Sequence, residues 1–357
     1  MRNTCELQAG SRVEVVDLQS AKHNGSQGIV LSAAESDNAE NAYEKGRRPV
    51  RLDGGELLSL KPANLRTAAY TICSVAGKGM GVVAARDIKR GERLIAEPPL
   101  LTFDPNSEPS GVVAAVNNLP PTRRASFDSL HNAHPGMGVL GTLSTNCIEV
   151  GSRTGIFGII SRFNHSCVPN VEWNWNDNLN AETIHATRDI SYGEELCASY
   201  LGMEARPGLC SSRDERSERL QASYGFVCSC PVCTLTGEEL SKSDRRRRAI
   251  FDLDQEIWDA VMKANVQKRD AGGEELVQRR LQLLEEEGLD ENSVRNRCMY
   301  DAYQACKYLG LHRRARTWLE DAAQHAKLFA GADSPEYERY VRMLKRPLND
   351  PHDPCYD

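Results

Sequence analysis

The pattern of hydrophobic and polar positions changes texture along the chain, and its first stretch reads as a small β module. Between residues 9 and 66, short β-branched runs such as Arg12–Leu18 alternate with turn signals such as Asp53-Gly54-Gly55. The other strands expected here are Gly28–Leu31, Pro49–Leu52 and Glu56–Leu60. Short strands joined in this way predict an SH3-like barrel, which serves either as a structural appendage or adaptor module, or as a peptide- or chromatin-binding site. The polar residues between Glu35 and Arg48 predict a loop.

The middle stretch is also rich in predicted strands. Thr71–Val75 and Met80–Ala85 flank the string Gly77-Lys78-Gly79. A phosphate-binding loop needs a helix after its glycines, and a strand follows here, so we expect a turn at which a ligand can approach the backbone. The further strands expected are Arg93–Leu101, Thr145–Val150, Thr154–Ile160, Val171–Trp175, Glu182–Thr187 and Glu195–Tyr200. Short helices are expected at Gly111–Asn117 and Thr122–His131.

The last stretch has a helical period. Ser212 and Glu215 have capping-box spacing and predict a helix that runs to about Ala222. From Asp244 onward, apolar residues such as Leu253 and Ile257 recur at helical spacing, with glycines and prolines between the segments. This pattern predicts an antiparallel helical array similar to a tetratricopeptide-type domain. The fold class expected for the whole chain is therefore α+β.

Composition narrows the function classes. The 357 residues predict two or three domains, and the net charge of −6 argues against nucleic-acid binding. There is no apolar run of membrane-spanning length and no signal-peptide core at the start, so we expect an intracellular protein of the nucleus or cytoplasm. In that reducing environment the 12 cysteines are expected to be thiols or metal ligands. The run Arg245–Arg248 reads as a solvated helix start or a nuclear signal.

Three segments carry the candidate chemistry. Asn164-His165-Ser166-Cys167 places an amide, an imidazole, a hydroxyl and a thiol at consecutive positions, which suits neither a core strand nor a core helix. Gly193–Tyr200 ends an apolar strand with a tyrosine, and Tyr224–Cys233 contains Cys-x-Cys-x-x-Cys. Three thiolates do not complete a tetrahedral zinc site, so a fourth ligand must come from elsewhere in the chain.

In this order, the three segments resemble the SET-domain protein-lysine methyltransferases. They are most similar to the subclass with a cysteine-rich zinc segment after the SET domain and a helical C-terminal domain. The resemblance implies S-adenosylmethionine as methyl donor, Tyr200 as the catalytic tyrosine and Tyr224 as part of the lysine channel. There is no cysteine between Cys73 and Cys147, so the MYND finger of related proteins is expected to be absent.

The resemblance also implies a donor site and a metal site. The residues expected to bind the donor are Lys78, Gly79, Asn146, Asn164, His165, Tyr200 and Phe226. The expected zinc ligands are Cys167, Cys228, Cys230 and Cys233, with Cys210 and Cys197 as alternatives for the fourth. A zinc ion that joins Cys167 to the later cysteines would hold Tyr224 and Phe226 over the donor pocket and couple metal binding to folding of the site.

These expectations give a domain plan and an activity. The plan is residues 1–67 for the barrel, 68–204 for the SET domain with an insert at about 103–144, 205–236 for the zinc segment and 237–357 for the helical domain. The expected activity is methylation of a lysine on a protein or peptide such as a histone tail, by a monomer with no membrane or nucleic-acid partner. One alternative is a non-catalytic adaptor that uses the SET core as a scaffold. A metal-dependent hydrolase is disfavoured because the chain lacks a His-rich open site.

Overall fold

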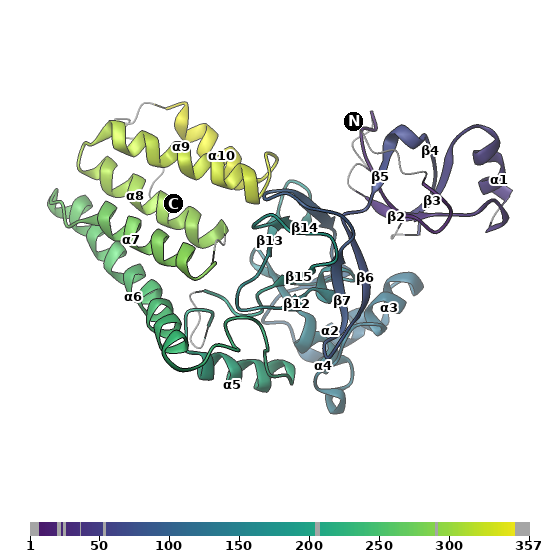
Figure 1. Ribbon diagram of the computed structural model, residues 1–357, viewed down its shortest axis with the longest axis horizontal. Helices are drawn as coiled ribbons and strands as arrows, with labels where there is room; N and C mark the ends of the chain where they lie inside the picture. The colour runs from purple at the N-terminus through teal and green to yellow at the C-terminus, as the bar shows by residue number, and fades with distance from the viewer. Residues whose placement is uncertain are drawn as a thin grey trace.

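The computed structural model describes residues 7–19, 23, 26–35, 37–52, 55–203, 208–289 and 292–346. The expected turn at Asp53-Gly54 lies outside these residues. Figure 1 shows three parts in a row: an N-terminal sheet, a central region of strands with short helices, and a helical region. We use these three names below.

The N-terminal sheet has five strands in the order β4-β3-β2-β1-β5, and each neighbouring pair is antiparallel. The strands are β1 Arg12–Val15, β2 Gln27–Val30, β3 Arg48–Leu52, β4 Leu57–Leu60 and β5 Leu65–Thr67. Val13, Val15, Val30 and Val50 are fully buried between them. The sheet agrees with the expected short strands, whereas its description as an SH3-like barrel stays a prediction.

The predicted loop after Glu35 is wrong, because helix α1, Asp37–Glu44, occupies it. One apolar side is enough to hold this short helix against the sheet. Ala42 is buried, and the Tyr43 hydroxyl donates a 2.8 Å hydrogen bond to the carbonyl oxygen of Leu31. A helix with so few apolar positions leaves little hydrophobic period in the sequence.

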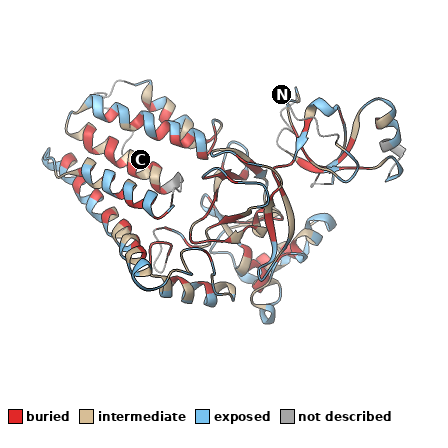
Figure 2. Cartoon of the chain, in the orientation of Figure 1, coloured by how far each residue is buried: buried red, intermediate tan, exposed pale blue. Residues whose placement is uncertain are grey.

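The central region contains three small sheets. Their orders are β12-β15-β7-β6, β13-β14-β8 and β10-β11-β9, and β12 runs parallel to β15. The strands are β6 Tyr70–Val75, β7 Gly79–Ala84, β8 Arg93–Glu97, β9 Leu101–Phe103, β10 Ile148–Val150, β11 Arg153–Ile156, β12 Asn164–His165, β13 Val171–Asn176, β14 Ala181–Ala186 and β15 Glu195–Ala198. Their core includes Phe157, Phe163 and Ile184, all fully buried, and Figure 2 shows buried positions mixed with intermediate and exposed ones along these strands.

The helices of the central region are α2 Pro109–Asn117, α3 Pro121–Asp128 and α4 Val139–Asn146. The strand predicted to begin at Thr145 is therefore wrong at its start, because α4 continues to Asn146. The Thr145 hydroxyl donates to the carbonyl of Gly141 one turn earlier, as is common inside helices. The strand predicted to end at Ile160 stops at Ile156. The Glu97 carboxylate accepts backbone N–H bonds from residues 158–160 and holds them in a turn.

The C-terminal part is helical, as predicted. Its helices are α5 Arg213–Tyr224, α6 Gly237–Gln267, α7 Gly273–Glu286, α8 Asn292–Tyr308, α9 His312–Phe329 and α10 Pro335–Leu344. We call α6–α10 the helical region, and its likeness to tetratricopeptide domains stays a prediction. Leu253, Ile257 and Val261 of α6 are buried, as their spacing indicated, while Met262 is 38% exposed.

In the part of the chain that the structure describes, polar contacts join the helical region to the central region at two separate places (Figure 1). At one, the buried Arg247 of α6 donates to the carbonyl oxygen of Cys167 over 3.1 Å. At the other, Asp333 after α9 forms an ion pair with Arg93 of β8, and its carbonyl accepts a 2.9 Å hydrogen bond from Asn178. The intervening helices therefore bridge two distant points of the central region.

The basic run Arg245–Arg248 is explained by the first of these contacts. Arg247 is fully buried, and both Arg246 and Arg247 form ion pairs with Glu287, at 2.6 and 2.8 Å. Neither a solvated helix start nor an accessible nuclear signal describes a run whose middle residues are held in this way.

Candidate active site and cysteine cluster

The candidate site is a pocket of about 1310 Å³ in the central region, which reaches α8 of the helical region through Val294 and Arg297. Its walls come from the β6–β7 turn, from β12, from the chain after β15 and from the end of α5. The predicted donor-binding and catalytic residues all line it: Lys78, Gly79, Asn146, Asn164, His165, Tyr200, Tyr224 and Phe226. The structure therefore brings together residues spread over about 150 positions.

Aromatic rings form one side of the pocket. The Tyr200 ring lies 4.9 Å from that of Tyr224 and 6.3 Å, edge to face, from that of Phe226, measured between centroids. The indole of Trp173 on β13 stacks on Tyr200 at 6.5 Å and 11°. We had predicted the strand of Trp173 but no role for the residue. The sequence feature that could have indicated a role for Trp173 is its position as an aromatic residue shortly after the Asn-His-Ser-Cys segment.

The end of α5 positions Tyr224 and Phe226. Ser212 and Glu215 form the predicted capping box at its start. The helix continues to Tyr224, two residues beyond the prediction, and Gly225 ends it with a φ of +76°, which glycine adopts without strain. The chain turns sharply there, so Tyr224 and Phe226 both face the pocket.

His165 connects Tyr200 to the cysteines. The backbone N–H of Tyr200 donates to Nδ1 of His165 over 3.0 Å, so the ring proton is on Nε2. This Nε2–H points to the sulfur of Cys167, 3.3 Å away. Burial lowers the pKa of His165 to about 4, which keeps the ring neutral. The side chain of His165 thus links Tyr200 to Cys167, and donor binding at His165 stays a prediction.

The Tyr200 side chain is fixed at its hydroxyl. The hydroxyl donates a 2.7 Å hydrogen bond to the carbonyl oxygen of Phe163, which orients the oxygen lone pairs. Burial raises the pKa of Tyr200 above its ordinary value, so the phenol stays protonated at neutral pH. Tyr200 is thus held at its backbone by His165 and at its hydroxyl by Phe163.

Glu195 holds two residues that line the pocket, Lys78 and Asn164, and the sequence does not predict this role. Its carboxylate accepts hydrogen bonds from Nζ of Lys78 at 2.6 Å and from Nδ2 of Asn164 at 2.9 Å. Because the amide nitrogen of Asn164 donates to Glu195, its Oδ1 is left to accept a hydrogen bond from a ligand. Gly81 of β7 makes room for this amide, since a Cβ there would lie 2.7 Å from Nδ2 of Asn164.

Asn146 lies on the wall of the pocket as the last residue of α4. Its side-chain nitrogen donates to the carbonyl oxygens of His131 and Thr142, both at 2.7 Å. These bonds fix the orientation of the amide, so its oxygen is the group left for a ligand.

The four predicted metal ligands form one cluster. The sulfur atoms of Cys167, Cys228, Cys230 and Cys233 all lie within 4.8 Å of one another, and those of Cys167 and Cys233 are 3.5 Å apart. Sulfurs bound to one tetrahedral zinc ion at ~2.3 Å are ~3.8 Å apart, so the cluster has the size and donor set of such a site. Cys197 and Cys210, the alternatives for the fourth ligand, are outside this cluster.

Comparison with known proteins gives the family. The family model "SET domain" matches residues 79–201. The histone-lysine N-methyltransferase set5 of Schizosaccharomyces pombe is 30% identical over 285 residues, which cover 79% of this chain and 85% of that protein. The chain belongs to the SET-domain protein-lysine methyltransferases.

Shorter matches lie within the same family. Human protein-lysine N-trimethyltransferase SMYD5 is 42% identical over 86 residues, which are 24% of this chain and 20% of that protein. Human protein-lysine N-methyltransferase SMYD4 is 32% identical over 108 residues, 30% of this chain and 13% of that protein. Among the residues that the structure describes, no helix has the length and apolar character needed to cross a bilayer.

Proposed function

We propose that this SET-domain protein transfers a methyl group from S-adenosylmethionine to the ε-amine of a lysine in a protein substrate. The observation that carries the proposal is the convergence of Tyr200, Tyr224 and Asn164 on one pocket beside the cysteine cluster. These residues come from separate segments, and their side chains have the chemistry that each step needs.

The lysine amine must lose its proton before it can attack. The ordinary pKa of lysine is about 10.4, and removal from water lowers it because the charged form loses hydration. Four aromatic rings beside the pocket would form a channel that removes the lysine side chain from water: those of Tyr200, Tyr224, Phe226 and Trp173. The fixed Tyr200 oxygen would then align the amine with the methyl carbon of the donor. Such alignment accelerates a displacement reaction, because the two reacting atoms are held in the geometry of attack.

The donor supplies a positively charged sulfonium methyl group together with an ammonium and a carboxylate. Oδ1 of Asn164 is oriented to accept from the ammonium, because Glu195 holds the amide nitrogen. Lys78, on the glycine turn, offers a cation for the carboxylate, and Phe226 offers an aromatic face for the adenine. In the structure Lys78 is paired with Glu195, so donor binding would share or replace that contact.

We propose that Cys167, Cys228, Cys230 and Cys233 hold a structural zinc ion. Four protein ligands leave no open position, so the ion would contribute a cross-link and no direct catalysis. The cross-link would join β12 to the segment after α5 and hold Phe226 beside His165, whose rings are 6.1 Å apart. The boundaries predicted above for the barrel, SET, zinc and helical domains belong to this proposal.

The direct test is methyl transfer from radiolabelled S-adenosylmethionine to a panel of folded proteins and peptides that includes histones. We expect labelled lysine in at least one target, with set5 of S. pombe supporting the choice of histones. Calorimetric titration with the donor separates an enzyme from a scaffold, since a scaffold has no need to bind it. Failure to bind the donor would contradict the proposal and favour the adaptor.

A further inference from the structure

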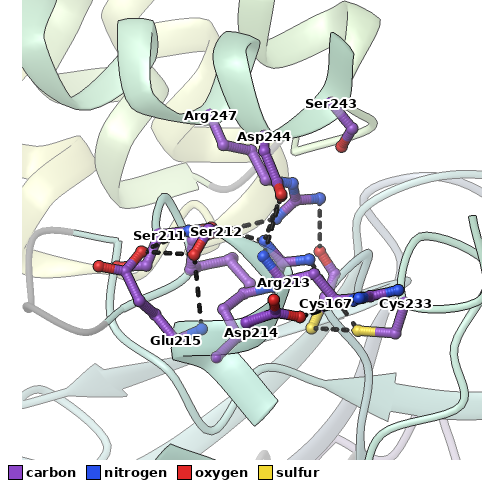
Figure 3. Close-up of polar contacts among 12 residues, drawn as sticks. Cys167, Ser211, Ser212, Arg213, Asp214, Glu215, Cys233, Ser243, Asp244 and Arg247 are labelled. Atoms are coloured by element: carbon purple, nitrogen blue, oxygen red, sulfur yellow. Dashed lines mark hydrogen bonds and ion pairs between the residues drawn. The ribbon is translucent and has the colours of Figure 1, made fainter. Parts of the chain in front are cut away.

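A buried cation lies against the cysteine cluster. Arg216, on the second turn of α5, is fully buried, and its Nη2 is 3.9 Å from the sulfur of Cys233. Its Nη1 donates a 2.6 Å hydrogen bond to the carbonyl oxygen of Ser211. Figure 3 shows the sulfurs of Cys167 and Cys233 directly below the polar contacts that lead toward α6.

The ion pair of Arg216 with Asp244 is long, and the Asp244 side chain is partly exposed, so it stabilises the buried guanidinium only weakly. Asp244 of α6 is 3.8 Å away and also accepts a 2.9 Å hydrogen bond from the backbone of Arg213. The Nε–H of Arg216 has no acceptor among the described residues. A buried guanidinium is always protonated and is costly without an anionic partner, so the structure calls for further negative charge beside it.

The cysteine cluster, with zinc bound, would carry excess negative charge that a nearby cation could balance. Four thiolates around one divalent zinc ion carry a net charge of −2 in a largely buried place. Neutral N–H donors offset part of that charge, as the Nε2–H of His165 does at Cys167. A cation in contact with the sulfurs offsets more. Groups just outside the ligands are known to tune metal affinity by 10–100-fold.

The other nearby arginine has a different role. Arg247 donates to the backbone carbonyl of Cys167, whereas Arg216 contacts a sulfur atom. Arg247 shares the buried carboxylate of Glu287 with Arg246, at 2.8 and 2.6 Å. Arg247 therefore anchors the helical region to the cluster, and Arg216 is left to balance the charge of the sulfurs.

We propose that Arg216 is the counter-charge of the metal–thiolate cluster and a positioning residue on which zinc retention depends. The inference rests on the proposed zinc site. It adds that α5 does two things at once: its C-terminal end carries Tyr224 into the pocket, and its first turns carry the cation that stabilises the cluster.

The test measures zinc and needs no substrate. Zinc content per chain and the rate of zinc transfer to a chromogenic chelator are measured for the full-length protein and three variants. Arg216→Met removes the charge at similar volume, and Arg216→Lys keeps the charge. Arg280→Met is the matched control, because Arg280 is also buried and pairs with Asp254 in the helical region, away from the cluster.

We expect Arg216→Met to release zinc at least tenfold faster than the wild type, Arg216→Lys to lie between them, and Arg280→Met to match the wild type. Should Arg216→Met fail to fold, Arg216→Gln replaces it, since glutamine is neutral and keeps an N–H donor in the buried site. Equal release from the neutral Arg216 variant and from Arg280→Met would overturn the inference. A wild-type protein without zinc would instead overturn the zinc site itself, which distinguishes the two failures.

Discussion

Single side chains in the pocket are held by partners that leave one polar atom free for a ligand. Tyr200 donates to Phe163 and keeps its lone pairs, and Asn164 donates to Glu195 and keeps Oδ1. Each group is thereby oriented before the substrate arrives, so little reorganisation is needed during the reaction.

Tyr200→Phe is expected to lower kcat by about 100-fold or more, because loss of one oriented polar group in an active site commonly has that effect. The variant loses one hydrogen bond to the Phe163 carbonyl, a change of about 1 kcal/mol in the free energy of unfolding. Single-turnover methyl transfer and thermal unfolding measure the two effects. Unchanged kcat on a true substrate would remove Tyr200 from its assigned role.

Gly81→Ala is expected to weaken donor binding by about tenfold, equivalent to ~1.4 kcal/mol. The added Cβ would lie 2.7 Å from Nδ2 of Asn164 and 2.6 Å from Cγ2 of Val75, so the amide must move. Calorimetry of S-adenosylmethionine binding gives the dissociation constant. Gly111→Ala is the control, since a Cβ there meets no atom within 4 Å; equal affinities for the two variants would contradict the prediction.

Among the elements, α5 connects the most functions. It begins at a capping box, carries Arg216 beside the cysteines and ends at Tyr224 in the pocket. Any change that frays this helix should therefore disturb the pocket and the cluster together.

Ser212→Ala removes the capping box of α5, where the Ser212 and Glu215 side chains each bond the other's backbone. Loss of such a cap is expected to reduce the free energy of unfolding by about 1 kcal/mol. Urea unfolding followed by circular dichroism measures this. Ser241→Ala on the exposed face of α6 is the matched control. If both variants lost the same free energy of unfolding, the capping box would contribute no more than an exposed serine elsewhere.

Sequence patterns predicted elements with a strong local signal and missed those without one. The capping box, the β6–β7 glycine turn and the Cys-x-Cys-x-x-Cys trio were all visible locally. Helix α1 was missed because it buries little, and the end of α4 was assigned to a strand. The roles of Glu195 and Arg247 depend on partners 117 and 80 positions away, Lys78 and Cys167, and no local pattern reports such pairs.

At the scale of the whole molecule, stability should depend on buried histidines. His185 of β14 is buried, its Nε2 accepts a hydrogen bond from Arg93 over 3.2 Å, and burial lowers its pKa to about 3. Arg93 in turn pairs with Asp333, so the histidine sits beside the second attachment of the helical region.

Acidification is therefore expected to destabilise the protein through His185. The unfolded chain takes up a proton below about pH 6.5 and the folded chain does not until about pH 3, so the free energy of unfolding falls as pH drops through that window. The slope is about 1.4 kcal/mol per pH unit for one such group. Urea unfolding at pH 7 and pH 5 for the wild type and His185→Gln measures it. An identical loss in both proteins would show that His185 does not contribute.

The two-point attachment of the helical region limits which targets can reach the pocket. The helical region contacts the central region at Cys167 and again at Arg93, and α8, which belongs to the same region, helps to line the pocket. Because the helical region is attached at two separate places, it cannot rotate away from the central region about one hinge unless one of these contacts breaks. Under the proposed function, the target lysine must enter a pocket that α8 helps to line, so we expect lysines on a narrow tail or protruding loop to be better substrates than lysines on a flat rigid surface.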